Sequence, residues 1–241
     1  MSSALLFFNE KTLLVQNKKS GEHLVEPYKI DAHSRFVEDR IVHLIQTNVI
    51  QKGFDLEEIY IDSSEGILIP GDIYDTKQKE AYFQLNYTDL DETKSVVDDK
   101  MDSMNAYFIS TRIKWFESFC RTHFPQTQLS NSSKKYLDTV ALAKKSNSEV
   151  HLVLKESSFD LIKYSNQKLI SFNTIAYDTV TDVVYFLLAH LNKLKNPAKS
   201  IDLFGSESQT KEAHELFNKI EVLKKIELNI FSQKERIKLL S

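Results

Sequence analysis

The sequence predicts an α/β protein built from two similar halves, each with the element order ββ-β-α-β-α-β. Short apolar stretches typical of strands alternate with longer stretches in which apolar residues recur every three or four positions, as in helices. The same order of elements occurs near the start of the chain and again after residue 149. The 241 residues are enough for two halves that each bury a core.

The first half opens with a predicted β-hairpin, followed by a third strand, a helix and a fourth strand. The hairpin turns at the polar trio Asn9-Glu10-Lys11, and Asp31–Ser34 offers capping side chains to the helix. The predicted elements are strands at Ala4–Phe8, Thr12–Gln16 and His23–Ile30, a helix from Phe36 to Val49, and a strand at Glu58–Asp62.

The second half repeats this order from Val150. Its hairpin turns at Lys155-Glu156-Ser157, and Asp178-Thr179 precedes its helix as a cap. The predicted elements are strands at Val150–Leu154, Phe159–Tyr164 and Lys168–Asn173, a helix from Val180 to Leu191, and a strand at Ser200–Phe204.

The spacing between equivalent features supports a duplication. The hairpin turns are 146 residues apart, the helix caps 147 and the fourth strands 142. Offsets that agree this closely indicate one structural unit used twice. We therefore place the first half at residues 1–146 and the second at 147–241.

Further elements are predicted to complete each half. In the first half these are helices at Thr76–Leu85, Thr111–His123 and Ser133–Lys145 and a strand at Asn105–Ser110; in the second, a helix at Gln209–Ile220 and a strand at Lys225–Ile230. The acidic stretch from Asp89 to Asp102, which includes Asp98 and Asp99, lacks the spacing and the glycine of a calcium-binding loop. We expect it to be a solvated connection.

Composition excludes several classes of function. A formal charge of −3 gives no electrostatic basis for binding nucleic acid. The N-terminus has no basic segment and only five consecutive apolar residues, so we expect neither a signal peptide nor a membrane span. Cys120 is the only cysteine and lies among helix-spaced apolar residues, which predicts a core position and fits a cytoplasmic protein.

Several short phrases occur at characteristic places in both halves. They are Leu68-Ile69-Pro70 before Asp72-Ile73-Tyr74-Asp75, Leu85-Asn86-Tyr87, His123-Phe124-Pro125, Phe159-Asp160-Leu161, Lys168–Thr174, Thr181–Leu188 and Leu203-Phe204-Gly205. These phrases resemble those of a small bacterial family of unknown function, which is assigned the actin-like ATPase fold, a ribonuclease H-like fold, and is distantly similar to the pilus-assembly protein PilM. The resemblance runs from about Leu5 to Asn229. It implies a histidine soon after Pro125, where this sequence has Ser130-Asn131.

The resemblance also implies where a ligand would bind. In this superfamily a nucleotide lies between the halves, and an Asp-x-Gly motif in each hairpin turn holds its phosphates, because glycine lets backbone N–H groups approach phosphate oxygens. Neither turn contains a glycine here, and neither first strand carries an aspartate. The candidate ligand-facing residues are Glu10, Lys11, Lys155, Glu156 and Ser158 in the turns, and Gly205 and Ser206 at the expected adenosine-contacting position.

These observations favour a non-catalytic actin-like module that binds a protein partner or a small ligand and needs no cofactor. The alternative is a divergent protein that binds ATP with Mg²⁺ through side chains. A two-metal nuclease is disfavoured, because neither first strand carries a carboxylate and Asp62 alone cannot hold two metal ions. P-loop, hydrolase and zinc motifs are absent from the sequence, so we expect no catalytic or metal-binding residues.

Overall fold

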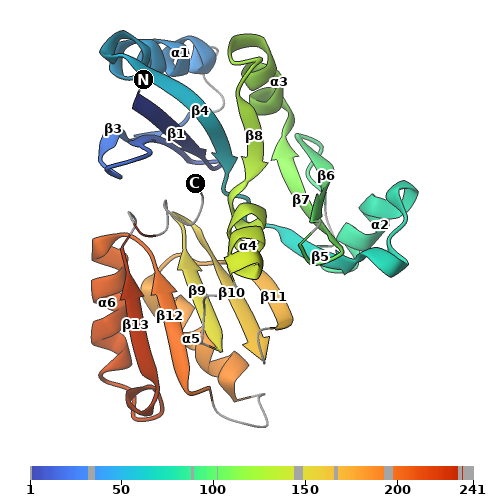
Figure 1. Ribbon diagram of the computed structural model, residues 1–241, viewed down its shortest axis with the longest axis vertical. Helices are drawn as coiled ribbons and strands as arrows, with labels where there is room; N and C mark the ends of the chain where they lie inside the picture. The colour runs from blue at the N-terminus through green and yellow to red at the C-terminus, as the bar shows by residue number, and fades with distance from the viewer. Residues whose placement is uncertain are drawn as a thin grey trace. The chain divides into compact units, whose positions relative to one another are not determined.

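A computed structural model describes residues 2–31, 36–87, 90–101, 103–143, 149–165, 168–192, 198–232 and 235. The chain divides into two compact units; unit 1 extends to Leu137, and unit 2 begins at Asp138. Each unit contains a five-stranded mixed sheet, and unit 1 has an additional three-stranded sheet (Figure 1).

The large sheet of unit 1 has the strand order β3-β2-β1-β4-β8. Its strands are β1 (Ser2–Phe8), β2 (Thr12–Asn17), β3 (His23–Lys29), β4 (Phe54–Ile61) and β8 (Gln128–Asn131). The first three strands form an antiparallel meander, while β4 is parallel to β1 and β8 is parallel to β4. The predicted hairpin, third strand and fourth strand are thereby confirmed.

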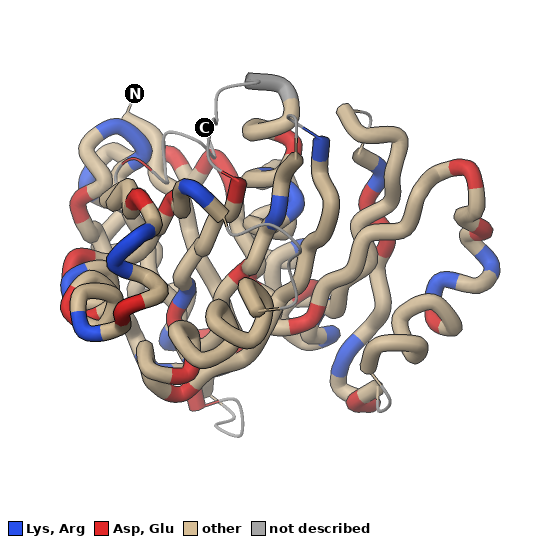
Figure 2. The backbone as a smooth tube through the Cα atoms, turned by 90° about the horizontal axis from the view of Figure 1, so that it is seen from below, with Lys and Arg blue, Asp and Glu red and all other residues tan. Residues whose placement is uncertain are grey.

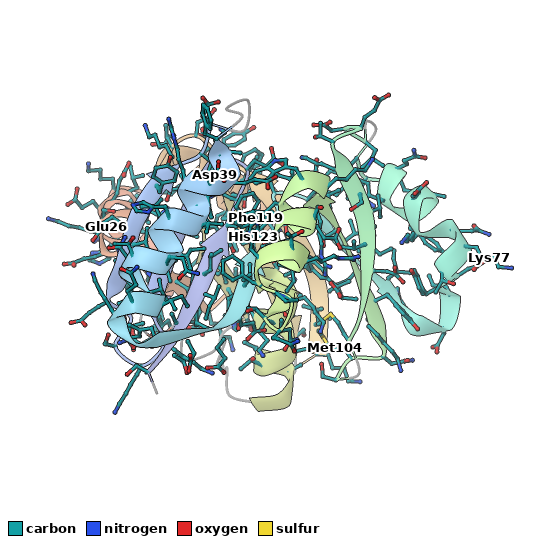
Figure 3. All side chains as sticks on the ribbon, turned by 90° about the horizontal axis from the view of Figure 1, so that it is seen from above. Glu26, Asp39, Lys77, Met104, Phe119 and His123 are labelled. Atoms are coloured by element: carbon teal, nitrogen blue, oxygen red, sulfur yellow. The ribbon has the colours of Figure 1, made fainter. Side chains whose placement is uncertain are left out.

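Two helices, α1 (Val37–Asn48) and α3 (Lys114–His123), share one core with this sheet. Ile41 and Ile45 of α1 and Phe116 of α3 are fully buried there. In α3 the ring of Phe119 lies 4.9 Å from that of His123, and Figure 3 labels both side chains. Cys120 is buried in this core, as the sequence predicts.

The start of α1 differs from the sequence prediction. Phe36 occupies the N-cap position, and its side chain makes no capping hydrogen bond. Most of the predicted capping stretch Asp31–Ser34 lies outside the described residues. A 3₁₀ turn, Ile50–Lys52, connects α1 to β4 and ends at Gly53, which has a φ of 79°. Glycine adopts this left-handed conformation at low cost.

The sheet of unit 2 has the equivalent strand order, β11-β10-β9-β12-β13. Its strands are β9 (Val150–Leu154), β10 (Ser158–Ser165), β11 (Lys168–Ala176), β12 (Ser200–Phe204) and β13 (Glu227–Phe231). Helices α5 (Val180–Leu191) and α6 (Glu207–Phe217) pack into a common core with it, and a 3₁₀ turn, Leu223–Lys225, precedes β13. Thr179 with Asp182 and Ser206 with Gln209 form capping boxes at the two helix starts.

The strand registers confirm the duplication. The last pair before the turn is Phe8 with Leu13 in unit 1 and Leu154 with Phe159 in unit 2, which again gives an offset of 146 residues. The two hairpins therefore correspond residue by residue across their turns.

Unit 1 also contains a small lobe inserted between β4 and α3. Its antiparallel strands are β5 (Gly66–Pro70), β6 (Lys94–Met101) and β7 (Ala106–Ile113), in the order β5-β7-β6. The 3₁₀ turns Gly71–Ile73 and Thr76–Gln78 lead into the short helix α2 (Lys79–Gln84). Phe83 of α2 packs on Ile67, Val96 and Ile109, which gives the lobe a core of its own.

The lobe corrects part of the sequence prediction. The stretch around Asp98 and Asp99 is strand β6, not a solvated connection; Asp89 and Asp102 lie outside the described residues. Asp98 accepts a 2.7 Å hydrogen bond from the hydroxyl of Tyr74, and Asp99 lies 3.2 Å from the guanidinium of Arg112. These partners allow a charged sequence to form a half-buried strand.

Smaller differences concern element ends. The helix predicted from Thr111 begins at Lys114, because residues up to Ile113 belong to β7. Helix α4 (Ser132–Ala143) corresponds to the helix predicted at Ser133–Lys145, whose last two residues lie outside the described chain.

Charges of both signs are interspersed along both units (Figure 2). Among the helices of the described chain, none has the length and apolar character needed to cross a membrane.

Candidate functional site

The hairpin turn of unit 1 is stabilised by its first residue. The side-chain oxygen of Asn9, Oδ1, accepts hydrogen bonds from the backbone N–H groups of Lys11 at 2.8 Å and Thr12 at 2.7 Å. The N–H of Asn9 donates to the carbonyl of Thr12 at 2.9 Å, which closes the turn. Asparagine is favoured in turns because its side chain can bond to nearby backbone in this way. Two backbone donors of this turn are therefore already used within the protein.

Glu10 and Lys11, the predicted ligand-facing residues of this turn, are both exposed. The carboxylate of Glu10 lies 2.5 Å from the Nζ of Lys94 in β6, and Lys94 also lies 3.4 Å from Glu65. Burial by itself lowers the pKa of Lys94, but the hydrogen bond to Glu10 and the negative charge of Glu65 outweigh it and raise the pKa. These contacts join the turn to the inserted lobe within unit 1.

The hairpin turn of unit 2 contains a buried ion pair. The Nζ of Lys155 lies 2.9 Å from Oδ1 of Asp160, and the exposed fractions of these side chains are only 1% and 0%. The hydroxyl of Thr174 donates to the same carboxylate oxygen at 2.9 Å. The other oxygen, Oδ2, is buried without a hydrogen-bond partner among the described residues. Lys155 thus directs its ammonium group into unit 2.

The backbone of Lys155 is also held in place. Its carbonyl accepts hydrogen bonds from the hydroxyl of Tyr177 at 2.6 Å and from the amide of Gln209 at 2.8 Å. Its N–H donates to the carbonyl of Ser158 at 2.9 Å, as the N–H of Asn9 does to Thr12 in the other turn. Because Gln209 belongs to the first turn of α6, this network connects the hairpin to the start of that helix.

The predicted adenosine-contacting residues have structural roles at the start of α6. Gly205 is buried, and a Cβ atom added there would lie 3.2 Å from both Leu154 Cβ and Thr210 Cγ2. The glycine therefore allows α6 to approach β9 closely. Ser206 caps α6 by accepting a hydrogen bond from the backbone N–H of Gln209.

The structure thus brings some predicted site residues together within one unit. Lys155, Ser158 and Ser206 belong to one hydrogen-bonded region of unit 2 that also contains Gln209, and Ser158 is buried there. Glu156 is exposed at the tip of the turn. Glu10 and Lys11 belong to unit 1, so the proposed arrangement of all seven residues around one ligand stays a prediction.

Two carboxylates, one in β4 and one directly after it, form a second polar region in unit 1. Glu58 is buried and accepts hydrogen bonds from the hydroxyls of Tyr60 at 2.7 Å and Ser130 at 3.0 Å. Burial, followed by this bond to Glu58, raises the pKa of Tyr60. Asp62 accepts a hydrogen bond from the hydroxyl of Ser132. Within the described part of the chain, no three His, Cys, Asp or Glu side chains gather as metal ligands would.

Sequence reasoning placed Asn9 in the first turn, but it did not identify Asp160, Tyr177 and Gln209 as parts of the second. Asp160 carried a usable signal, because an aspartate between Phe159 and Leu161 in an apolar strand needs a buried partner. Tyr177 and Gln209 carried none, since they are 22 and 54 residues from Lys155 along the chain.

A family model described as "Protein of unknown function (DUF3822)" matches residues 9–223. The chain belongs to this family. Comparison with proteins of curated function yields no match to this DUF3822 member.

Comparison with solved structures shows that this DUF3822 protein has the actin-like ATPase fold. A Bacteroides thetaiotaomicron protein, described as having that fold and unknown function, gives a TM-score of 0.74 at 14% identity over 100% of this chain and 96% of that one. The PilM–PilN type IV pilus biogenesis complex gives a TM-score of 0.61 at 11% identity over 98% and 90% of the two chains. The resemblance anticipated from short sequence phrases is confirmed.

Proposed function

We propose that this protein is a non-catalytic actin-like module that binds a protein partner. The observation that carries the proposal is the occupied turn of unit 1, in which Asn9 accepts hydrogen bonds from the N–H groups of Lys11 and Thr12. Phosphate-binding loops depend on free backbone N–H groups of this kind. A turn that uses them internally is poorly suited to hold a nucleotide.

The second turn supports the same proposal. The ammonium group of Lys155 is buried against Asp160, where it neutralises a carboxylate of the protein itself. Lysines that bind phosphate present their ammonium group to the ligand as a point charge. Lys155 acts instead as an internal structural residue.

The inserted lobe offers a surface suited to a protein partner. Leu85, which follows α2, is 81% exposed, and Ile73 is 65% exposed. The hydroxyl of Tyr82 in α2 donates to the carbonyl of Ile73 at 2.7 Å, so these two segments adjoin. Exposed apolar side chains beside tyrosines are typical of interface centres. PilM, a structural neighbour, was solved in complex with PilN.

Thermal unfolding with ATP and Mg²⁺ tests whether nucleotide binds. A ligand at 100 times its dissociation constant adds about 2.7 kcal/mol of stability, which raises the melting temperature of a chain this long by roughly 5 to 10 °C. We expect no shift at millimolar ATP, while an authentic actin-like ATPase serves as the positive control. A clear shift would favour the alternative, a divergent ATP-binding protein.

Affinity capture with matched variants tests the partner surface. The double variant Ile73→Asp and Leu85→Asp places charges on the lobe, and we expect it to lose a protein that the wild type retains. Val222→Asp is the control, because Val222 is 56% exposed but lies in unit 2. Equal capture by wild type and the double variant would contradict the assignment of this surface.

A further inference from the structure

The inserted lobe carries more negative charge than the chain as a whole. Residues 62–113 contain eleven aspartates and glutamates but only five lysines and arginines, which gives the lobe a formal charge of −6. The formal charge of the whole chain is −3, so the residues outside the lobe together carry +3. Uneven charge of this kind creates a local field that attracts partners of the opposite sign.

Most basic residues of the lobe already have an acidic partner. The pairs are Lys79 with Asp98 at 3.5 Å, Lys94 with Glu65 at 3.4 Å and Arg112 with Asp99 at 3.2 Å. In each pair the acidic residue also belongs to the lobe, so the two charges offset each other there. The excess negative charge of the lobe therefore lies on its other carboxylates.

The exposed apolar residues of the lobe form one surface that is continuous across Tyr82. The hydroxyl of Tyr82 donates to the carbonyl of Ile73. Residues three or four positions apart are neighbours on the surface of a helix, so Tyr82 also adjoins Leu85. Ala81 is exposed and lies four positions before Leu85 on the same side of α2. These four residues are the apolar surface of the lobe.

Two aspartates without an ionic partner border this apolar surface. Asp72 directly precedes Ile73, and the backbone N–H of Asp75 donates to the hydroxyl of Tyr82 at 3.3 Å. Both aspartates are exposed, and neither forms an ion pair with a described residue. Their hydrogen bonds come from neutral donors, the amide of Asn105 to Asp72 and a backbone N–H to Asp75. Their charges are therefore available to a partner.

We propose that the lobe binds a basic segment of a partner protein, in which lysines or arginines lie beside apolar side chains. This inference rests on the proposed function and names the chemistry of the partner. The apolar side chains pack on the apolar surface of the lobe, and the cations lie near Asp72 and Asp75. The exposed Lys77 offsets at most one of these charges, and its side chain extends away from the lobe (Figure 3).

The sign of the charge also selects a protein over other macromolecules. An acidic surface repels the phosphates of nucleic acids and the headgroups of anionic lipids. In protein interfaces, charges at the rim raise the association rate and disfavour partners of the wrong sign. The apolar surface and its acidic border together fit a basic protein segment.

Binding of two synthetic peptides to the full chain tests the sign of the charge. In the basic peptide, leucines recur every three or four positions among lysines, and the acidic peptide has glutamate in place of each lysine. We expect fluorescence anisotropy to show that the basic peptide binds at least about tenfold more tightly than the acidic one. The difference should shrink as salt is added, because salt screens exposed charges.

Neutralisation of the two aspartates tests whether the basic peptide binds at this place. Asp72→Asn with Asp75→Asn removes both charges but keeps an oxygen that can accept the same hydrogen bonds. We expect this variant to bind the basic peptide about three to ten times more weakly than the wild type. The matched control is Glu212→Gln with Glu215→Gln, which removes the same charge from exposed positions on α6 of unit 2 and should leave binding unchanged.

Ile73→Ser with Leu85→Ser tests the proposed function separately, because it removes apolar side chains and leaves the charge of the lobe unchanged. We expect it to weaken binding of the basic peptide at least about tenfold. If only this variant weakens binding, the lobe remains a partner surface, but the inference of a basic partner is overturned. If neither lobe variant weakens binding, both proposals are overturned. Equal binding of the two peptides, or no binding of the basic one up to hundreds of micromolar, also overturns the inference.

Discussion

Replacement of Lys155 by methionine tests whether this lysine is a structural residue or a ligand-binding one. Methionine keeps an unbranched chain of similar size but has no ammonium group. In the variant, Asp160 remains fully buried and keeps only the hydroxyl of Thr174 among its two described hydrogen-bond partners. Its Oδ2 atom already has none in the described chain. The carboxylate would therefore be buried without a compensating charge.

The expected loss of stability is large for a single substitution. Removal of one partner from a buried ion pair costs about 3 to 5 kcal/mol of the free energy of unfolding, because the remaining charge stays desolvated. Replacement of both partners by apolar residues is often neutral. We therefore expect Lys155→Met to lose about 3 to 5 kcal/mol. The double variant Lys155→Met with Asp160→Leu should recover most of that loss.

Urea unfolding measures the free energy of unfolding of the single and the double variant. Far-UV circular dichroism reports both units, whereas the fluorescence of Trp115, the only tryptophan, reports unit 1. If the loss of stability is confined to unit 2, the dichroism should begin to change at lower urea concentrations than the fluorescence. Lys163→Met in β10 is the control, and we expect a change within about 0.5 kcal/mol because this side chain is partly exposed.

The reasoning is refuted if Lys155→Met loses less than about 1 kcal/mol, the range expected of a surface pair. It is also refuted if the double variant is as unstable as the sum of the two single variants, since the residues would then not interact. In either case Lys155 would again become a candidate for ligand binding.

Three further predictions concern single residues. Gly205→Ala should cost about 1 to 3 kcal/mol in urea unfolding, because the new methyl group crowds Leu154. Burial raises the pKa of Cys120 to about 12, so its thiol should not react with Ellman's reagent at pH 8 until urea unfolds the protein. The backbone N–H of Thr179 lowers the pKa of Asp182 below 3.8, so this carboxylate contributes stability above that pH and loses it as the pH falls through its lower folded value. Asp182→Asn should therefore be less stable than the wild type at pH 7, but its free energy of unfolding should fall less between pH 7 and pH 3. If the variant and the wild type differ by the same amount at both pH values, the capping role is contradicted.

The sequence was most informative where the periodicity of side chains reflects burial. Strand β12 has the bounds predicted from its apolar run, because all but its first residue are buried. Helix α5 follows the predicted stripe, with Val180, Val183 and Leu187 facing the core. In such elements the local pattern and the tertiary environment agree.

Elements stabilised by distant partners could not be found in this way. Strand β8 is only four residues long and partly polar, and the hydroxyl of its Ser130 bonds to Glu58, which lies 72 residues earlier. The charged strand β6 likewise depends on Tyr74 and Arg112 for its aspartates. Neither pattern indicates a strand until its neighbours in space are known.

The candidate turns show the same limit. Their positions follow from the duplicated pattern, and the structure confirms that both are hairpin turns. Their chemistry does not follow from the pattern. Asn9 uses its side chain to bond the local backbone, whereas Lys155 reaches a carboxylate on the next strand. Equivalent positions in a duplicated fold can therefore have different roles.

The position of the inserted lobe determines which part of this protein can change in length and sequence without altering the rest. In unit 2 the chain passes from β12 to α6 through Gly205 and Ser206 alone, whereas in unit 1 residues 62–113 lie between β4 and α3. The second unit thus shows that a two-residue connection suffices at this place. Since the lobe has its own core, it can be exchanged, shortened or given a new surface while the five-stranded scaffold beneath it keeps its strands and helices.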